Sequence, residues 1–252
     1  MMDLAPIARI GLLLVRPGVL IIVAPSFGGT FAPAHVKIGL TVLLALALLP
    51  STSTALPPST ADLALLVMRE AAIGLALGMA MRALVAAAEF AGHLAGFQIG
   101  LSYSAIVDPQ SGVRNNVLAA LYGQIATVTL FLVNGHHAFL RALEATYARL
   151  PIGAGQVGES LPAAVIGMLG LVFMLGTRLA APLVLVLVIT EIALGLAARS
   201  APALNLMASG APVRLLVGLV LLGITAPMAS GVVAGMVDSV VQLGLSASAV
   251  FR

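Results

Sequence analysis

Long apolar blocks, separated by short stretches rich in proline, glycine and polar residues, make up most of this sequence. The blocks cover residues 7–24, 36–49, 61–88, 92–106, 117–133, 163–198 and 211–237. None shows the alternation of apolar and polar residues that is typical of half-buried strands. Several blocks begin with a serine shortly before a proline, an arrangement that favours a helix start. These starts are Ser160 before Pro162, Ser200 before Pro202, and Ser209 before Pro212. The sequence therefore predicts an all-α protein.

The low content of charged residues determines whether such helices are stable in water or in a membrane. Charged residues make up 8% of the chain and hydrophobic residues 61%, whereas soluble domains carry about 25% charged residues. Lipid or partner protein must therefore cover most of the surface, and we predict a membrane protein. The 12 basic and 9 acidic residues are scattered, which excludes the basic patch of a nucleic-acid-binding protein. No basic leader precedes the first apolar block, so we expect this block to be retained.

The block lengths do not match simple membrane spans, which need about 20 residues. Block 36–49 is too short, and block 163–198 would form about 54 Å of helix. Dividing the latter between Gly176 and Pro182 leaves two pieces that are both too short. Non-ideal segments of this kind are tolerated where neighbouring protein covers them. We therefore expect helical hairpins and broken helices packed in a multi-subunit assembly.

Charged side chains lie inside these blocks. An isolated arginine at bilayer depth costs at least ~2.5–3.5 kcal/mol, and the chain also lacks tryptophan and has only 3 tyrosines to form an interfacial aromatic belt. We expect the helices to face protein more than lipid. Arg82 and Glu89 lie about 20° apart around a helix. They either form a polar stripe that lines a conduit or contacts a partner, or they are satisfied within the chain. Residues predicted to make polar contacts within the assembly are Arg82, Glu89, Asn134, Arg178 and Glu191.

Four glycine pairs have the G-x-x-x-G spacing that lets helices approach closely. They are Gly74/Gly78, Gly92/Gly96, Gly96/Gly100 and Gly231/Gly235. Chance alone gives nearly as many pairs for 26 glycines in 252 residues. The triple Gly92, Gly96 and Gly100 stands out, and we predict that it forms a close-packed face.

No constellation of catalytic or metal-binding residues emerges from the sequence. The chain has no cysteine, and its histidines (His35, His93, His136 and His137) lack the spacing of a helical zinc site. A nucleophile elbow, a Walker A loop and a polar pair of carboxylates are also missing. We therefore predict a protein that is not an enzyme and has neither metal nor cofactor.

The segment from Gly96 to Gly112 interrupts the apolar pattern near its middle. A small-residue helix leads into Asp108-Pro109, where the residue before proline disfavours helix. The polar residues that follow end at Asn116, before the helical pattern resumes at Val117. From the residues alone, this segment is either an exposed interhelical loop or a re-entrant loop that faces a pore.

Five ordered motifs resemble the FliR family of flagellar export-gate proteins, related to injectisome proteins, over essentially the whole chain. The motifs are Gly96–Ser102 with Asp108-Pro109-Gln110, Asn134-Gly135-His136, Leu150-Pro151-Ile152-Gly153, Ala193–Leu196 and Arg199–Asn205. The resemblance implies one integral membrane domain, residues 1–252, in the bacterial inner membrane at the flagellar basal body. It implies FliP, FliQ, FlhB and FlhA as partners and unfolded flagellar proteins as substrates.

In the family that this chain resembles, the loop matching residues 102–117 plugs the closed pore. The resemblance therefore implies a plug loop whose predicted residues are Tyr103, Ile106, Val107, Asp108, Pro109 and Gln110. The family often has aromatic residues before Asp-Pro, whereas this chain has Ile106 and Val107, which implies a seal of aliphatic side chains. Two alternatives remain: a secondary transporter for a small solute, built on broken helices around Glu191 or Arg178, and a purely structural membrane scaffold.

Overall fold

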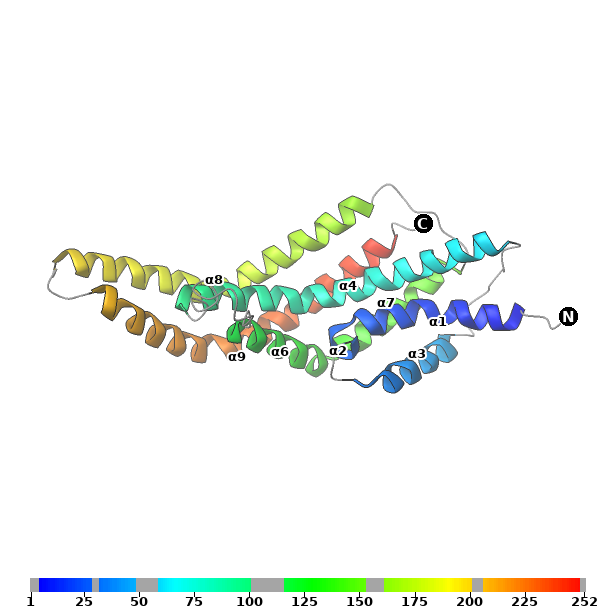
Figure 1. Ribbon diagram of the computed structural model, residues 1–252, viewed down its shortest axis with the longest axis horizontal. Helices are drawn as coiled ribbons and strands as arrows, with labels where there is room; N and C mark the ends of the chain where they lie inside the picture. The colour runs from blue at the N-terminus through cyan, green and yellow to red at the C-terminus, as the bar shows by residue number, and fades with distance from the viewer. Residues whose placement is uncertain are drawn as a thin grey trace, which may run out of the picture. The chain divides into compact units, whose positions relative to one another are not determined.

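The computed structural model describes residues 5–28, 32–48, 59–100, 116–152, 161–200 and 206–249. The described helices are α1 (Ala5–Val23), α2 (Pro25–Gly28), α3 (Ala34–Leu48), α4 (Thr60–Ile99), α6 (Val117–Leu132), α7 (Gly135–Arg149), α8 (Leu161–Ser200) and α9 (Leu206–Ser248) (Figure 1). No strand occurs within these ranges. The prediction of an all-α membrane protein is confirmed.

Some of the long helices start where the sequence predicts, and others do not. Ser59 caps α4, because its hydroxyl accepts a hydrogen bond from the Asp62 amide at 3.2 Å and donates one to the Asp62 carboxylate at 2.8 Å. Helix α8 places Pro162 in its first turn, as expected. Two predicted starts are wrong: Ser200 is the last residue of α8, and α9 begins before Ser209.

The predicted break between Gly176 and Pro182 is also wrong, because α8 continues through it as one helix of 40 residues. An interior proline removes one backbone hydrogen bond. Leu179, Ala180 and Leu183 are buried on either side of it, so tertiary packing holds the helix together at this point. Blocks 61–88 and 92–106 likewise merge, as far as Ile99, into the single helix α4.

A bend does occur elsewhere, between α6 and α7, whose axes differ by 69°. Asn134 occupies the turn with φ 55°, a left-handed conformation that asparagine tolerates better than most residues. It stands at the N-cap of α7, but its side chain makes no capping hydrogen bond. Its carbonyl oxygen instead accepts from the His137 amide at 3.0 Å.

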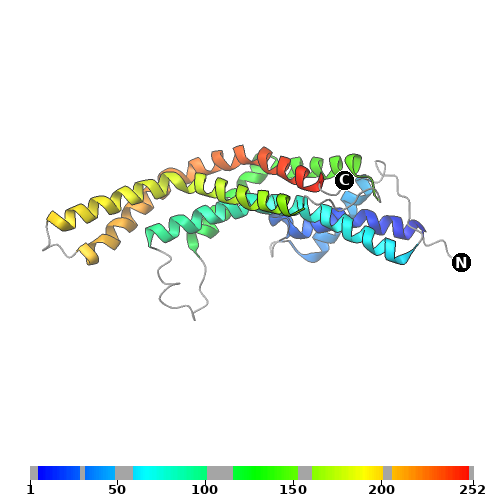
Figure 2. The same ribbon diagram turned by 90° about the horizontal axis from the view of Figure 1, so that it is seen from above.

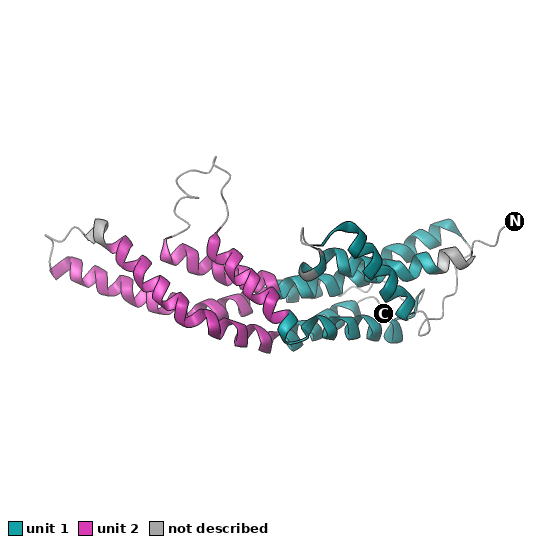
Figure 3. Cartoon of the chain, turned by 90° about the horizontal axis from the view of Figure 1, so that it is seen from below, with its two compact units in different colours: residues 1–84, 131–170, 237–252 teal, residues 85–130, 171–236 magenta. Residues whose placement is uncertain are grey.

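The chain divides into two compact units, coloured separately in Figure 3. Unit 1 comprises residues 1–84, 131–170 and 237–252, and unit 2 comprises residues 85–130 and 171–236. Helices α4, α8 and α9 contribute residues to both units. Within unit 1, α1 lies against α3 (Figure 2).

In unit 1, α1 crosses α4 at two glycines. A Cβ atom on Gly74 would lie 2.5 Å from the Arg16 carbonyl oxygen, and one on Gly78 would lie 2.8 Å from the Val23 Cβ. The backbones therefore approach too closely for any side chain at Gly74. By contrast, Gly231 and Gly235, which have the same spacing, have no atom within 4 Å of their Cβ positions.

Among the described residues, three helices are long and apolar enough to cross a membrane, or up to four candidate spans result if α6 and α7 count as one. These are Thr60–Ile99, Ala163–Ser200 and Gly210–Ser248. The most apolar 18-residue window is 61% buried in the first helix but only 22% and 17% buried in the second and third. Helices α8 and α9 thus leave most of their apolar surface uncovered by this chain.

We expect Gly74→Ala to lower the thermal stability of the purified chain by ~1–3 kcal/mol, because the added methyl group meets backbone atoms that cannot rotate away. Gly39→Ala in α3 is the matched control. Its Cβ position has no atom within 4 Å, and alanine favours helix by ~1 kcal/mol over glycine, so its melting temperature should stay equal or rise. Equal melting temperatures for both variants would contradict the α1–α4 crossing.

Candidate functional site

In unit 2, the end of α4 is fastened to the start of α6. The Asn116 side-chain oxygen accepts hydrogen bonds from the amides of Leu118 at 3.0 Å and Ala119 at 3.3 Å, and so caps α6. Its side-chain nitrogen donates to the His93 carbonyl oxygen of α4 at 3.4 Å. Asn116 therefore joins the two helices on either side of residues 101–115.

The predicted glycine face lies at the same junction. A Cβ on Gly92 would come within 2.4 Å of the Leu118 carbonyl oxygen, and one on Gly96 within 2.4 Å of the Asn116 side chain. Gly100 differs, since no described atom lies within 4 Å of its Cβ position. Its φ of 94° requires glycine for the turn that ends α4. Helices α4 and α6 thus meet backbone to backbone at Gly92, and Gly96 leaves room for the Asn116 side chain.

Three polar side chains link α4, α8 and α9 near this junction. Both carboxylate oxygens of Glu191 are engaged: one accepts from the Gln98 amide nitrogen at 3.2 Å, and the other pairs with the Arg214 guanidinium at 2.8 Å. The side chains of Arg214 and Glu191 remain 34% and 37% exposed. The Arg214 Nε is buried and has no hydrogen-bond partner among the described residues.

An apolar cluster surrounds this polar link. Ile99 of α4, Leu118 of α6, and Leu183 and Leu187 of α8 are buried together, with Leu215 of α9 packed against them. A Cβ on Gly218 of α9 would lie 2.5 Å from Ile99 Cγ1. The Glu191–Arg214 ion pair thus packs against this apolar cluster on one side and is partly exposed on the other. It lies at the surface of unit 2, on helices that are otherwise apolar.

The remaining predicted contact residues occupy separate positions. Glu89 packs on α6, where a Cβ on Gly123 would lie 3.0 Å from the Glu89 Cγ. Arg82 is exposed on α4 and belongs to unit 1, while Arg178 is exposed on α8 in unit 2. Arg82 and Glu89 thus fall in different units. The predicted plug residues Tyr103, Ile106, Val107, Asp108, Pro109 and Gln110 lie outside the described residues.

Sequence reasoning missed the most deeply buried polar network, which lies in unit 1. Arg16 of α1 and Glu70 of α4 are 0% and 1% exposed and form a two-point ion pair. The Arg16 guanidinium also donates to the Leu150 carbonyl oxygen at 2.8 Å, and to the Thr146 hydroxyl at 3.4 Å. It stacks 4.4 Å from the centre of the Tyr147 ring. The network ties α1, α4 and the C-terminal end of α7 together.

The signal for this network was present in the sequence as two opposite charges in separate apolar blocks. The sequence does not show that these two charges pair with each other, because 54 positions separate Arg16 from Glu70. The Leu150 carbonyl belongs to the Leu-Pro-Ile-Gly motif, whose first residue thereby receives a structural role. In the part of the chain that the structure describes, no group of three or more histidine, aspartate or glutamate residues could hold a metal ion.

Apolar helices that contain ion pairs such as Arg16–Glu70 and Glu191–Arg214 define a helical membrane protein with polar contacts between its helices. Residues 7–240 match the family described as bacterial export proteins, family 1. The chain is 34% identical to the flagellar biosynthetic protein FliR of Escherichia coli (strain K12) over 216 residues, which are 85% of this chain and 83% of that protein. The chain belongs to this family of bacterial export proteins.

Other relatives carry the same name. The identity is 33% to FliR of Pectobacterium carotovorum subsp. carotovorum, over 85% of this chain and 82% of that protein. It is 28% to FliR of Bacillus subtilis (strain 168), over 84% of this chain and 83% of that protein. The resemblance drawn from the five motifs is thus confirmed. Flagellar biosynthesis and protein export are the processes that these names give.

The buried pair yields a prediction through a double-mutant cycle. Either Arg16→Met or Glu70→Leu alone should destabilise the chain by ~3–5 kcal/mol, because each leaves one buried charge unpaired. The double variant should recover a large part of this loss, since it leaves no unpaired charge. Thermal unfolding of the four proteins in one detergent measures the coupling. Additive losses would show that Arg16 and Glu70 do not stabilise each other.

Proposed function

We propose that this chain is a non-enzymatic subunit of the flagellar protein export gate in the bacterial inner membrane. In this proposal it forms part of the wall of the channel through which unfolded flagellar subunits leave the cell. FliP, FliQ, FlhB and FlhA are the proposed partners. The family of bacterial export proteins and the FliR relatives support a role in export, and the wall position is argued below from the helices.

The observation that carries the proposal is the length of exposed apolar surface on α8. Large exposed apolar side chains occur from Val165 to Leu196, which corresponds to about 47 Å of helix. A straight helix would need a tilt of about 50° to hold that length within a ~30 Å hydrocarbon core, beyond the roughly 0–40° range of membrane helices. Lipid alone therefore does not cover α8, and partner protein is the remaining cover.

The half-exposed ion pair favours the same cover. Glu191 and Arg214 lie between exposed apolar residues such as Ile189 and Ile192 of α8 and Leu216 of α9. Charged groups at bilayer depth are found facing protein or water rather than acyl chains.

The plug loop stays a proposal that rests on the resemblance. The described residues contribute its support, since Asn116 and the Gly92–Leu118 contact hold the two flanking helices together. Tyr103, Ile106 and Val107 would provide the apolar seal, and Asp108, Pro109 and Gln110 the turn.

The wall position can be tested with a photo-crosslinking residue placed along α8. At Ile189 and Ile192, which are 57% and 59% exposed, we expect crosslinks to other export-gate proteins, identified by mass spectrometry of the complex purified in mild detergent. Leu187 on the same helix is 0% exposed and should give no intermolecular product. Crosslinks to lipid alone, together with a monodisperse chain that moves a small solute, would favour the secondary transporter.

The plug proposal makes a separate prediction. Deleting residues 104–112 should leave the complex assembled and raise its ion conductance in planar bilayers, because the seal is removed while Asn116 still joins the flanking helices. The Asn116→Ala variant with the intact loop is the comparison: it loses the ~1 kcal/mol of a helix cap and the hydrogen bond to His93, but it keeps the seal, so its conductance should stay low. Conductance unchanged after the deletion would argue against a plug in this segment.

A further inference from the structure

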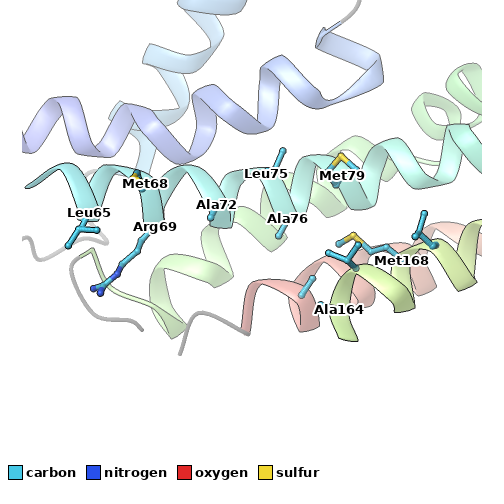
Figure 4. Close-up of a pocket in the computed structure, with 12 residues that line it drawn as sticks. Leu65, Met68, Arg69, Ala72, Leu75, Ala76, Met79, Ala164 and Met168 are labelled. Carbon is cyan, nitrogen blue, oxygen red and sulfur yellow. The ribbon is translucent and has the colours of Figure 1, made fainter. Parts of the chain in front are cut away.

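A cavity of about 580 Å³ opens in unit 1 beside the N-terminal half of α4. Its walls include Leu65, Arg69 and Met79 of α4, Met168 and Leu169 of α8, and Ala247 of α9 (Figure 4). We call this cavity the α4 groove. Arg69 is the one polar residue among the described residues that line it. We propose that the α4 groove binds an anionic phospholipid, with the lipid phosphate on Arg69 and one acyl chain along α4.

The lining residues follow one face of α4. Leu65, Arg69, Ala72 and Ala76 recur at spacings of four, three and four, which places them in one row along a helix. In Figure 4, Arg69 lies toward the N-terminal end of this row, and its side chain extends to the same side as those of Leu65 and Ala76. The groove thus has a charged group at one end and apolar side chains along the rest of its length. A phospholipid has the same arrangement, with a charged headgroup and apolar acyl chains.

The dimensions fit an acyl chain. The ten-residue step from Arg69 to Met79, both of which line the groove, rises about 15 Å along the helix, and each leaflet of a ~30 Å core is also about 15 Å deep. Three methionines line the groove, Met68, Met79 and Met168. Their flexible side chains adapt to ligands without a fixed shape. One side of the groove is closed by α9, because a Cβ on Gly244 would lie 2.9 Å from the Ala80 Cβ on α4.

The charge at the end of the groove calls for an anion. Arg69 is half-buried within a candidate span, and it makes no hydrogen bond or ion pair with another described residue. Neighbouring carboxylates do not supply one: Glu70 is paired with Arg16, and Asp62 is held by Ser59. A planar guanidinium binds phosphate oxygens at two points, better than an ammonium group does.

The groove favours lipid over a partner helix. Leu65, Met68, Leu75 and Leu169 are exposed by about half or more, so the groove is open along its length, as a laterally diffusing lipid requires. Its contents need only an apolar chain and one phosphate, and the membrane around a candidate span supplies both. This inference depends on α4 lying in a membrane and not on the chain forming a channel wall.

The test uses the full-length chain, in the assembly with which it co-purifies, reconstituted in phosphatidylcholine nanodiscs. Each sample carries a trace of photoactivatable phosphatidylglycerol or of photoactivatable phosphatidylcholine with the same acyl chains. Mass spectrometry then locates the labels on peptides that cover residues 65–79 and 164–169. We expect phosphatidylglycerol to label these peptides about fivefold more strongly, the preference of a single arginine for an anionic lipid.

Variants separate the headgroup contact from the acyl contact. Arg69→Gln should remove the fivefold preference, and Arg69→Lys should retain most of it. Arg141→Gln, which removes an exposed arginine of α7 away from the groove, should leave it unchanged. Ala76→Phe narrows the groove while keeping Arg69, so it should reduce labelling by both lipids.

Three results would overturn the proposal. The first is equal labelling by the two lipids in the wild-type chain, a comparison that does not depend on any variant folding. The second is a preference that persists in Arg69→Gln. The third is an unlabelled groove in which a photo-crosslinker at Leu75 captures a partner protein instead, which would assign the groove to protein.

Discussion

A charge inside an apolar helix must find its partner within protein, and this requirement sets the packing of both units. In unit 1, Arg16 reaches Glu70 because Gly74 lets the α1 backbone lie against α4. The guanidinium then has donors left for Leu150 and Thr146, which bring in the end of α7. One arginine therefore fixes the mutual register of three helices that share little other polar chemistry.

The same requirement is met differently in unit 2. Glu191 satisfies both of its oxygens through Gln98 and Arg214, yet about a third of each charged side chain stays exposed. A sealed pair such as Arg16–Glu70 needs nothing further, whereas a half-exposed pair among apolar side chains depends on what surrounds it. The first pair is buried within the fold of the chain itself, and we propose that a neighbouring subunit covers the surface around the second.

Composition and block pattern were sufficient to predict an all-α membrane protein with charged side chains inside its apolar blocks, two of which are Arg16 and Glu70. Their pairing could not be predicted, because it depends on tertiary contacts between blocks far apart in sequence. The predicted break near Pro182 failed for a related reason: buried neighbours such as Leu183 outweigh one lost hydrogen bond. Asn116 could have been found, since an asparagine directly before an apolar block is a standard capping signal. At the N-cap of α7, Asn134 contributes a left-handed backbone conformation and no capping side chain.

We propose that lipid and partner protein each cover a different part of this chain, according to the geometry of its helices. The apolar length of α8 exceeds what a bilayer accommodates, so protein must cover some of it. The α4 groove, by contrast, has a length comparable to a single leaflet and ends in a cation. Proteins that assemble in a membrane retain lipid where the helices leave such a cavity, because neither an empty apolar cavity nor a bare arginine is stable there. A bound phospholipid and neighbouring subunits are therefore compatible covers for the same helices, at different positions along them.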